Sequence, residues 1–286
     1  VSAWRAITTL AKARPPLAVV GTGGYAAGVA SAWARANRVP LFLHESDSHP
    51  GLTTRQFAKA ASAIFLGFPE AQKRIVVGAR TLVFPMGCPI TPPPADAPTR
   101  LDARRAWGFP DDAFVVLVVG GSQGARALNE SVAGWCKAGL PENVALIWAT
   151  GRATADAFLQ YETAMVRVRP YLSPINSAYA AADLAVTRAG ANTIAEQCAW
   201  GIPSVLVPLP TAAQDHQTHN ARAVESAGAA IYLAQSELSV HSLDATVREL
   251  RTQPDVLMKM AHRAVLRGQP NAAADIAHQI LSMIAL

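Results

Sequence analysis

Short apolar runs alternate with longer amphipathic stretches along almost the whole chain. In the first third, strands are predicted at 17–20, 40–43, 63–66 and 81–84, and helices at 25–37 and 52–60. The alternation then resumes, with strands predicted at 114–119, 144–149, 165–169, 184–187 and 204–207. Helices are predicted between and after them at 125–137, 153–161, 174–181, 192–199, 215–227, 238–250, 254–267 and 271–284. This alternation predicts an α/β fold in which helices cover both faces of parallel sheets.

A proline-rich stretch at 91–98 separates the two series. Its four prolines are incompatible with a helix or a central strand, so we interpret it as an interdomain linker. The predicted domains are 1–90 and 99–268, with a last helix at 269–286 that packs back on the first domain. Both domains are expected to be doubly wound and Rossmann-like, but the first has about four strands where six or seven are usual. Because the chain begins with Val1 rather than Met, we expect the first domain to be incomplete at its N-terminus.

Composition narrows the class of protein. Apolar residues make up 51% of the 286 residues, which excludes disorder as the main state, and no apolar run approaches the ~20 residues of a membrane span. The net charge is +5, and 20 of the 25 basic residues are arginine, whose planar guanidinium suits anionic partners. No basic stripe interleaved with aromatic residues indicates nucleic acid. Three widely spaced cysteines, Cys88, Cys136 and Cys198, lack metal-binding spacing and favour a reducing compartment.

Glycine-rich turns follow the first predicted strand of each series, at 21–24 and 120–124. Ligands of such sheets bind at the carboxyl ends of the strands, where glycine allows backbone N–H groups to approach an oxyanion. Neither turn is a strict dinucleotide-binding or Walker motif, and each taken alone is also compatible with a tight connection between a strand and a helix. Two such turns, one in each half, indicate an anion site between the halves.

Two further segments carry polar residues at helix starts. Residues 190–196 open a predicted helix whose first N–H groups can hold a diphosphate, with Glu196 one turn further on to accept ribose hydroxyls. Alternatively, Glu196 is only a glutamate near a helix N-terminus, where its negative charge stabilises the helix dipole. The segment 214–220 carries amides that suit sugar hydroxyls, or a solvated helix start with Asp215 as its N-cap. His216 and His219 have no evident third ligand, and there is no DxD motif, so no metal site is predicted.

Taken together, these motifs resemble the MurG family of glycosyltransferases, which transfer N-acetylglucosamine (GlcNAc) from UDP-GlcNAc to lipid I in peptidoglycan synthesis. The resemblance covers essentially the whole chain, in order and spacing. It rests on the segments 19–25, 44–53, 120–126 (GGSQGAR), 188–193 and 215–221 (DHQTHNA). The resemblance implies a GT-B fold of two Rossmann-like domains with the donor site in the cleft. It also implies an inverting hexosyltransferase that requires no metal or other cofactor.

The resemblance implies roles for individual donor-site residues. Ser122 and Gly124 would hold the nucleotide diphosphate, and the backbone around Leu172 would read the uracil edge. Glu196 would accept the ribose hydroxyls. The helix start formed by Ala191, Asn192 and Thr193 would face the phosphate and sugar, and the GlcNAc hydroxyls would be contacted by His216, Gln217 and Asn220.

The resemblance also implies an acceptor side and a membrane. Lipid I and anionic phospholipids of the inner leaflet would be partners, together with cell-wall synthesis proteins, and the protein would sit peripherally on the cytoplasmic face of the membrane. Trp4 and Trp33 are expected to form an apolar membrane patch. The acceptor side would be lined by Gly23, Gly24, Tyr25, His44, Glu45 and Asp47.

The sequence departs from the family pattern at several positions. Ser46 and Asp47 stand where the family has Gln and Asn, and Thr91 stands where it has an arginine that would reach the donor phosphate. Family members also begin with a glycine-rich loop containing a histidine proposed as the catalytic base. Roughly the first 70 to 80 residues of the family pattern have no counterpart here, as expected for an incomplete half-domain of this kind. No catalytic residue is therefore assigned.

Two alternative functions stay open from the sequence. One is an enzyme similar to UDP-GlcNAc 2-epimerases on the same fold, which would turn over UDP-GlcNAc without an acceptor. The other is a non-catalytic nucleotide-sugar-binding subunit that needs a partner chain to supply the missing loop.

Overall fold

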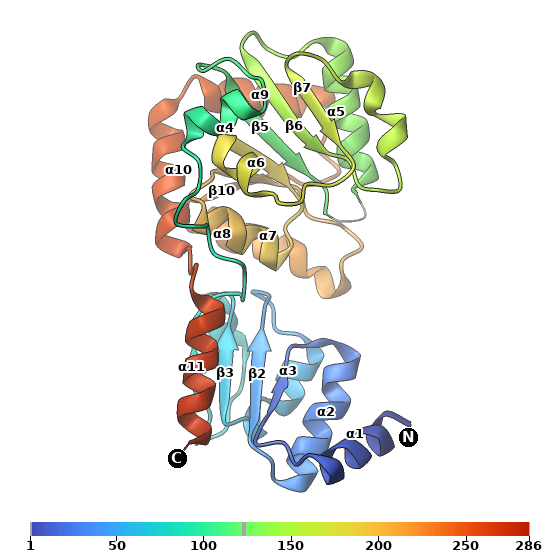
Figure 1. Cartoon of the computed structure of the whole chain (residues 1–286), viewed down its shortest axis with the longest axis vertical. Helices are drawn as coiled ribbons and strands as arrows, with labels where there is room; N and C mark the ends of the chain where they lie inside the picture. The colour runs from blue at the N-terminus through green and yellow to red at the C-terminus, as the bar shows by residue number, and fades with distance from the viewer. Residues whose placement is uncertain (1, 122–123, 286) are drawn as a thin grey trace. The chain divides into compact units, whose positions relative to one another are not determined.

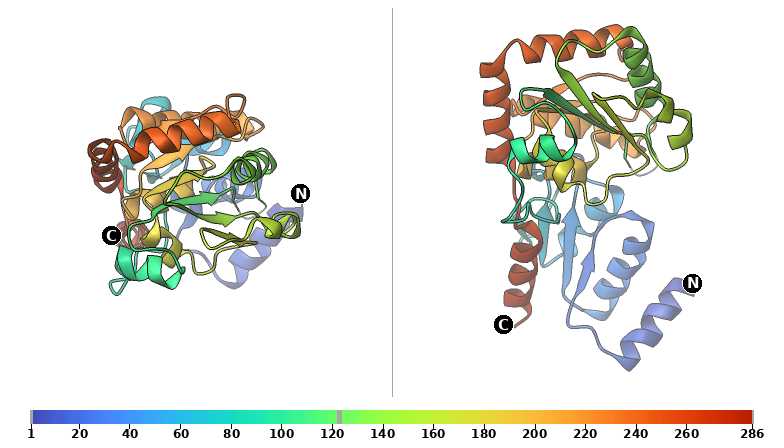
Figure 2. Two further views of the ribbon diagram at one scale, coloured as in Figure 1. Left: turned by 90° about the horizontal axis from the view of Figure 1, so that it is seen from above. Right: turned by 45° about the horizontal axis from the view of Figure 1, so that its top comes forward.

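The computed structural model describes residues 2–121 and 124–285, which form two compact units. The N-terminal unit comprises residues up to Thr91 together with those from Gln269 onward, and the C-terminal unit comprises Pro92–Gly268. Each unit contains one sheet with parallel pairing throughout, and helices pack on it (Figure 1, Figure 2). The predicted α/β class is confirmed.

The N-terminal unit has four strands in the order β1-β2-β3-β4, namely β1 (Val19–Gly21), β2 (Leu41–Glu45), β3 (Ala63–Leu66) and β4 (Leu82–Phe84). One face packs on helices α1 (Ser2–Ala13), α2 (Gly24–Asn37) and α3 (Leu52–Phe57) through Leu41, Leu43 and Ile64. On the other face, Phe42 and Phe65 pack against Ala272 and Ile276 of the C-terminal helix α11 (Ala272–Ile284). Figure 1 shows α11 running beside β3. The end of the chain is thus part of the N-terminal unit.

The C-terminal unit has six strands in the order β10-β9-β8-β5-β6-β7. Their bounds are Phe114–Val119 (β5), Val144–Ala149 (β6), Val166–Arg169 (β7), Leu184–Thr187 (β8), Ser204–Leu206 (β9) and Ala230–Tyr232 (β10). The central strands are buried on both faces, which is why they are continuous runs of β-branched and aliphatic residues rather than alternating ones.

Helices cover both faces of this second sheet. One face packs on α5 (Arg126–Ala138), α9 (Val240–Arg251) and α10 (Pro254–Arg267), and the other on α4 (Arg100–Ala106) and α6 (Asn176–Ala181). The helix α7 (Ala191–Ala199) follows β8, and α8 (His216–Ser226) follows β9. Trp135 and Trp148 are the largest fully buried side chains, and both lie in the core beneath α5 and α9.

The structure differs from the pattern-based prediction at several places, three of which lie in the C-terminal unit. The helix predicted at 153–161 is replaced by two 3₁₀ turns, Ala155–Ala157 and Leu159–Tyr161, because Phe158 and Tyr161 turn inward to pack on Trp148. Strand β10 was not predicted, since it is only three residues long and pairs with β9 alone. Helix α4 was also not predicted. Its sequence is strongly charged, and it is held in place by contacts with distant residues.

Asp183 provides the main polar contact of α4. Its carboxylate accepts hydrogen bonds from Arg104 Nη2 at 2.5 Å, from Arg100 Nη1 at 3.2 Å and from the backbone N–H of Val115 at 2.8 Å. One carboxylate thus joins α4 to the start of β5, just ahead of its own strand β8. The Arg104 and Asp183 side chains are largely buried, so removing Asp183 leaves Arg104 without its charged partner and the N–H of Val115 without its acceptor.

We expect Asp183→Ala to lower the free energy of unfolding by about 2 to 3 kcal/mol, because the largely buried Arg104 loses its charged partner and the backbone N–H of Val115 loses its acceptor. Urea unfolding of the whole chain followed by circular dichroism measures the change. The matched control is Asp111→Ala, which breaks an exposed ion pair with Arg105 on the same helix and should cost clearly less. Equal losses in the two variants would contradict the assignment.

Candidate functional site

The strand order of the C-terminal unit marks where a ligand can bind. From β5 the chain winds outward through β6 and β7 in one direction, and β8, β9 and β10 extend the sheet in the other. The loops after β5 and β8 therefore diverge and leave a crevice at the carboxyl ends of these strands. A cavity of about 610 Å³ is formed by these loops. It is lined by Gly120, Gly121, Gly124, Ala125, Arg126, Ala127, Glu130, Arg188, Gly190, Thr193, Leu209, Gln217 and Gln235.

The glycine-rich loop after β5 forms one wall of this cavity. Gly124 has a φ of +77°, and a Cβ at this position would lie 2.3 Å from the carbonyl oxygen of Thr150. Any side chain here would push the loop away from the end of β6, so the loop requires glycine. Helix α5 begins directly after the loop without a side-chain cap, which leaves its first N–H groups unpaired within the helix. Ser122, predicted to bind the diphosphate, lies outside the described residues.

Asn129 fixes the first turn of α5 against the neighbouring strand. Its Nδ2 donates to the carbonyl of Thr150 at 2.7 Å, and its Oδ1 accepts from Trp148 Nε1 at 3.0 Å. All three residues are buried. These bonds hold the first turn of α5 against the end of β6.

The start of α7 forms the opposite wall. Gly190 is its N-cap and has no capping side chain, and the helix ladder begins with the N–H of Ile194 donating to Gly190. The N–H groups of Ala191, Asn192 and Thr193 therefore have no partner within the helix and carry its partial positive charge. Thr193 lines the cavity, and Glu196 lies one turn further along the same face. Such a helix start is suited to an anionic group.

Arg188 is a functional candidate that the sequence analysis did not single out. It lines the cavity, yet it is only 9% exposed. Its Nη1 donates to the carbonyls of Val207 and Pro208 at 3.1 and 3.0 Å, and its Nη2 to Gln235 Oε1 at 2.6 Å. All of these acceptors are uncharged, and burial lowers the pKa of the guanidinium below its ordinary value. Its position directly after the apolar strand β8, at the carboxyl edge of the sheet, could have identified it from the sequence.

The polar segment at the start of α8 is only partly turned toward the cavity. Gln217 lines it, and its Oε1 accepts from the backbone N–H of Leu209 at 3.0 Å. His216 does not line it, and its Nδ1 lies 2.8 Å from the carbonyl of Ala213. Asn220, predicted to contact the sugar, does not line the cavity. This side chain is 0% exposed and donates to the carbonyl of Ala189 at 3.2 Å, so it holds the loop before α7.

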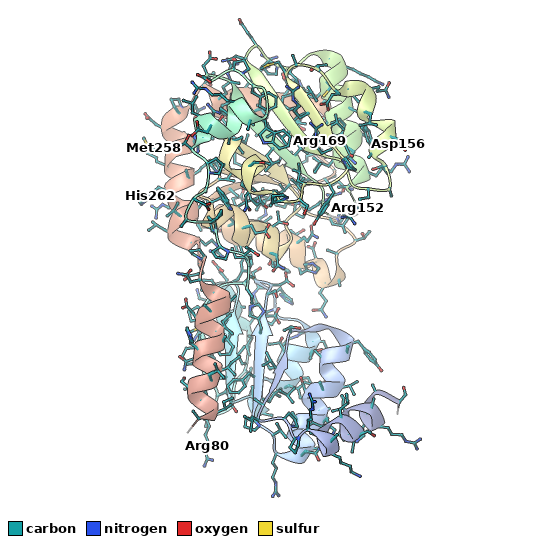
Figure 3. All side chains as sticks on the ribbon, in the orientation of Figure 1. Arg80, Arg152, Asp156, Arg169, Met258 and His262 are labelled. Carbon is teal, nitrogen blue, oxygen red and sulfur yellow. The ribbon has the colours of Figure 1, made fainter. Side chains whose placement is uncertain are left out.

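The loop after β7 carries Leu172, whose side chain is buried in the core beside α6. This burial leaves its backbone as the group available for recognition. The adjacent Tyr171 is exposed, with the guanidinium carbon of Arg152 4.6 Å from its ring centroid. Arg152 follows the end of β6 and is labelled in Figure 3. Two loops from the carboxyl edge of the sheet thus meet here.

The N-terminal unit presents a second glycine turn. Gly23 and Gly24 have φ values of +88° and +75°, and a Cβ at either position would meet no neighbour within 4 Å. Tyr25, which follows them, is exposed. These three predicted acceptor-side residues therefore lie at an open surface after β1.

His44 and Glu45 are placed differently from the prediction that they face a substrate. Both are buried; Glu45 Oε1 accepts from the N–H of Asp47 at 3.1 Å and Oε2 from the N–H of Gly51 at 2.9 Å. His44 Nε2 lies 3.2 Å from the carbonyl of Gly87. Burial lowers the pKa of His44 and raises that of Glu45. They organise the loop at 46–51, and of the three predicted residues only Asp47 is partly exposed.

The two tryptophans predicted to form a membrane patch differ in exposure. Trp4 on α1 is 39% exposed. Trp33 is only 5% exposed, packs in the core of the N-terminal unit, and donates from Nε1 to Thr8 Oγ1 at 3.2 Å. The prediction for Trp33 is therefore wrong, since its indole holds α2 against α1.

The described residues contain neither a candidate metal site nor a helix that could span a membrane. Within 2–121 and 124–285, no group of three or more His, Cys, Asp or Glu side chains has an arrangement suited to a metal ion. In the same ranges, no helix has both the length and the apolar character needed to cross a membrane.

Comparisons with known proteins identify relatives along the whole chain. Residues 115–280 match the glycosyltransferase family 28 C-terminal domain, and residues 1–66 match the glycosyltransferase family 28 N-terminal domain. A relative from Salinibacter ruber is 39% identical over 288 residues, covering 99% of this chain and 75% of the relative. One from Moorella thermoacetica is 38% identical over 280 residues, covering 94% and 74%. Both are named UDP-N-acetylglucosamine–N-acetylmuramyl-(pentapeptide) pyrophosphoryl-undecaprenol N-acetylglucosamine transferase.

Solved structures agree with these relatives. The crystal structure of Acinetobacter baumannii MurG is 30% identical, with a TM-score of 0.78 over 98% of this chain and 76% of that one. A putative UDP-N-acetylglucosamine 2-epimerase from Listeria monocytogenes has a TM-score of 0.68 over 98% and 77% but is only 16% identical, so it shows the fold alone. The predicted GT-B fold is confirmed, and the chain belongs to the MurG family of glycosyltransferases.

Proposed function

We propose that this chain transfers GlcNAc from UDP-GlcNAc to the muramyl 4-hydroxyl of lipid I, with inversion at the anomeric carbon. The observation that carries the proposal is the cavity between the glycine-rich loop after β5 and the uncapped start of α7. It lies at the switch point of a parallel sheet, where nucleotides bind. The names of the relatives supply the donor and acceptor.

The cavity fits a nucleoside diphosphate by charge. Unpaired N–H groups at the starts of α5 and α7 would donate hydrogen bonds to the phosphate oxygens, as helix N-termini do for anions. Arg188 would add a positive charge, since the carbonyls and the amide that accept its hydrogen bonds are uncharged groups. Gln217 would contact the sugar, Glu196 the ribose hydroxyls, and the backbone at Leu172 the uracil.

The transfer itself needs the leaving diphosphate to be stabilised. As the acceptor hydroxyl forms its bond to the anomeric carbon, the bond to UDP breaks and negative charge develops on the phosphate. Preorganised N–H groups and a buried guanidinium lower the energy of this charge without having to reorient. Arg188 would then supply positive charge to the leaving phosphate. No metal or other cofactor is part of this proposal.

The acceptor would reach the protein from a membrane surface, on which the N-terminal unit would dock peripherally. The supporting feature is α1, in which no residue is buried. Trp4 and Leu10 of α1, and Leu17 after it, are exposed. Arg5, Lys12 and Arg14 stand among them, and basic residues of this kind attract an anionic leaflet. The open turn at Gly23, Gly24 and Tyr25 would contact the acceptor.

The transferase function predicts that UDP is released only when acceptor is present. Purified protein is incubated with UDP-GlcNAc, with and without a lipid I analogue, and UDP and disaccharide product are quantified by mass spectrometry. We expect product only with the acceptor, and the same yield after treatment with EDTA. Conversion of UDP-GlcNAc to its 2-epimer without acceptor would contradict the proposal. So would UDP-GlcNAc binding without any transfer, which would favour a non-catalytic subunit.

The ribose role predicts that Glu196→Gln weakens UDP binding about 10- to 100-fold, because a charge-assisted hydrogen bond contributes ~1.5 to 3 kcal/mol. Isothermal titration calorimetry measures the dissociation constant. Glu142→Gln is the matched control, since Glu142 is exposed and precedes β6 at the opposite edge of the sheet. An unchanged UDP affinity in Glu196→Gln would remove the ribose assignment.

Peripheral docking predicts that the double variant Trp4→Ser/Leu10→Ser binds phosphatidylglycerol-containing vesicles at least about tenfold more weakly, because it removes apolar surface from the contact. Vesicle flotation measures the bound fraction. Leu159→Ser is the control, since it alters an exposed leucine of the C-terminal unit. If the double variant floats with the vesicles as well as the wild type does, α1 has no role in membrane docking.

A further inference from the structure

A hydrogen bond joins Tyr179, which does not line the cavity, to Glu196, the residue proposed to bind the ribose. The Tyr179 hydroxyl donates to Glu196 Oε2 at 2.7 Å. The tyrosine lies on α6 and is only 3% exposed, whereas Glu196 on α7 is partly exposed. Within the described residues, Glu196 Oε1 has no such partner. The carboxylate thus has one oxygen held by the protein and one free to accept.

We propose that Tyr179 is a positioning residue that orients the Glu196 carboxylate and presents its Oε1 to the ribose of the donor nucleotide. The inference rests on the proposed function, because it assigns Glu196 to the ribose hydroxyls. A glutamate side chain that is partly exposed samples several rotamers, and fixing it on binding costs conformational entropy. A hydrogen bond already made in the free protein removes part of that cost.

The surroundings of Tyr179 make it a rigid donor. Its ring packs against Trp200, with ring centroids 6.0 Å apart, and it belongs to the same core cluster as Leu172. Burial and the adjacent carboxylate raise the pKa of Tyr179, so its hydroxyl stays protonated and can only donate to Glu196. The direction of the bond is therefore fixed over the whole neutral pH range.

The same packing joins two parts of the predicted nucleotide site. Leu172 lies in the loop that leads from β7 to α6, and its backbone is assigned to the uracil. Glu196 lies on α7, which follows β8. Tyr179 belongs to the same hydrophobic cluster as Leu172, and its hydroxyl donates to Glu196. It therefore sets the position of the ribose contact relative to the base contact.

The test is a double-mutant cycle read out with two nucleotides. UDP and its dideoxy analogue, which lacks both ribose hydroxyls, are titrated calorimetrically into the wild-type chain, Tyr179→Phe, Glu196→Gln and the double variant. We expect Tyr179→Phe to weaken UDP binding about fivefold in the wild-type background and not at all in Glu196→Gln. Binding of the dideoxy analogue should be the same in wild type and Tyr179→Phe, which also shows that the variant is folded.

Tyr161→Phe is the matched control, because it removes a tyrosine hydroxyl from another aromatic cluster of the same unit. If Glu196→Gln binds UDP like wild type, the ribose assignment fails and the inference with it. If Glu196→Gln weakens binding but Tyr179→Phe does not, the positioning role alone is overturned. The same holds if Tyr179→Phe weakens UDP and the dideoxy analogue equally, since the tyrosine would then be merely structural.

Discussion

The parallel pairing of β5 with β6 on one side and β8 on the other is the constraint on which the C-terminal unit depends. The register pairs Val119 with both Ala149 and Thr187, and Thr187 with Leu206, so four strands end level at one edge of the sheet. The residues that follow therefore meet: Gly124 lies against Thr150, Asn129 bonds to Thr150, and Arg188 bonds to the loop after β9. A shift of register in any one strand would separate these loops and remove the cavity.

The electrostatics of the cavity follow from this frame. Two helices begin at its walls without capping side chains, and a guanidinium is buried among uncharged acceptors. In the free protein this arrangement is costly, because burial without a counter-charge disfavours a cation. An anionic ligand would supply the missing counter-charge, so the same features would favour the diphosphate of the proposed donor. Polar residues of one sequence motif can have different roles. Gln217 lines the cavity, whereas Asn220 donates a hydrogen bond to the loop before α7.

The N-terminal unit shows the same division. The carboxylate of Glu45 accepts hydrogen bonds from two backbone N–H groups of the loop at 46–51, and His44 Nε2 lies beside the backbone carbonyl of Gly87. Both side chains therefore stabilise the local backbone. Trp33 likewise joins α1 and α2 through its indole N–H, whereas Trp4 remains at the surface. Residue type alone did not distinguish these cases, because a buried carboxylate and a substrate-binding one occur at the same kind of position, directly after a strand.

The sequence by itself determined the alternation of strands and helices, the parallel character of both sheets and the glycine-rich loops at which we propose that the donor binds. These follow from local periodicity and from glycine at positions that tolerate no other residue, as at Gly124. It did not determine β10, α4 or the 3₁₀ turns near Phe158, which depend on partners distant in the chain. Only the tertiary structure decided which motif residues face the cavity, that Arg188 is buried beside it and that Tyr179 holds Glu196. The physical reason is that the orientation of a side chain is set by what packs around it, and packing is a property of the folded chain rather than of any one segment.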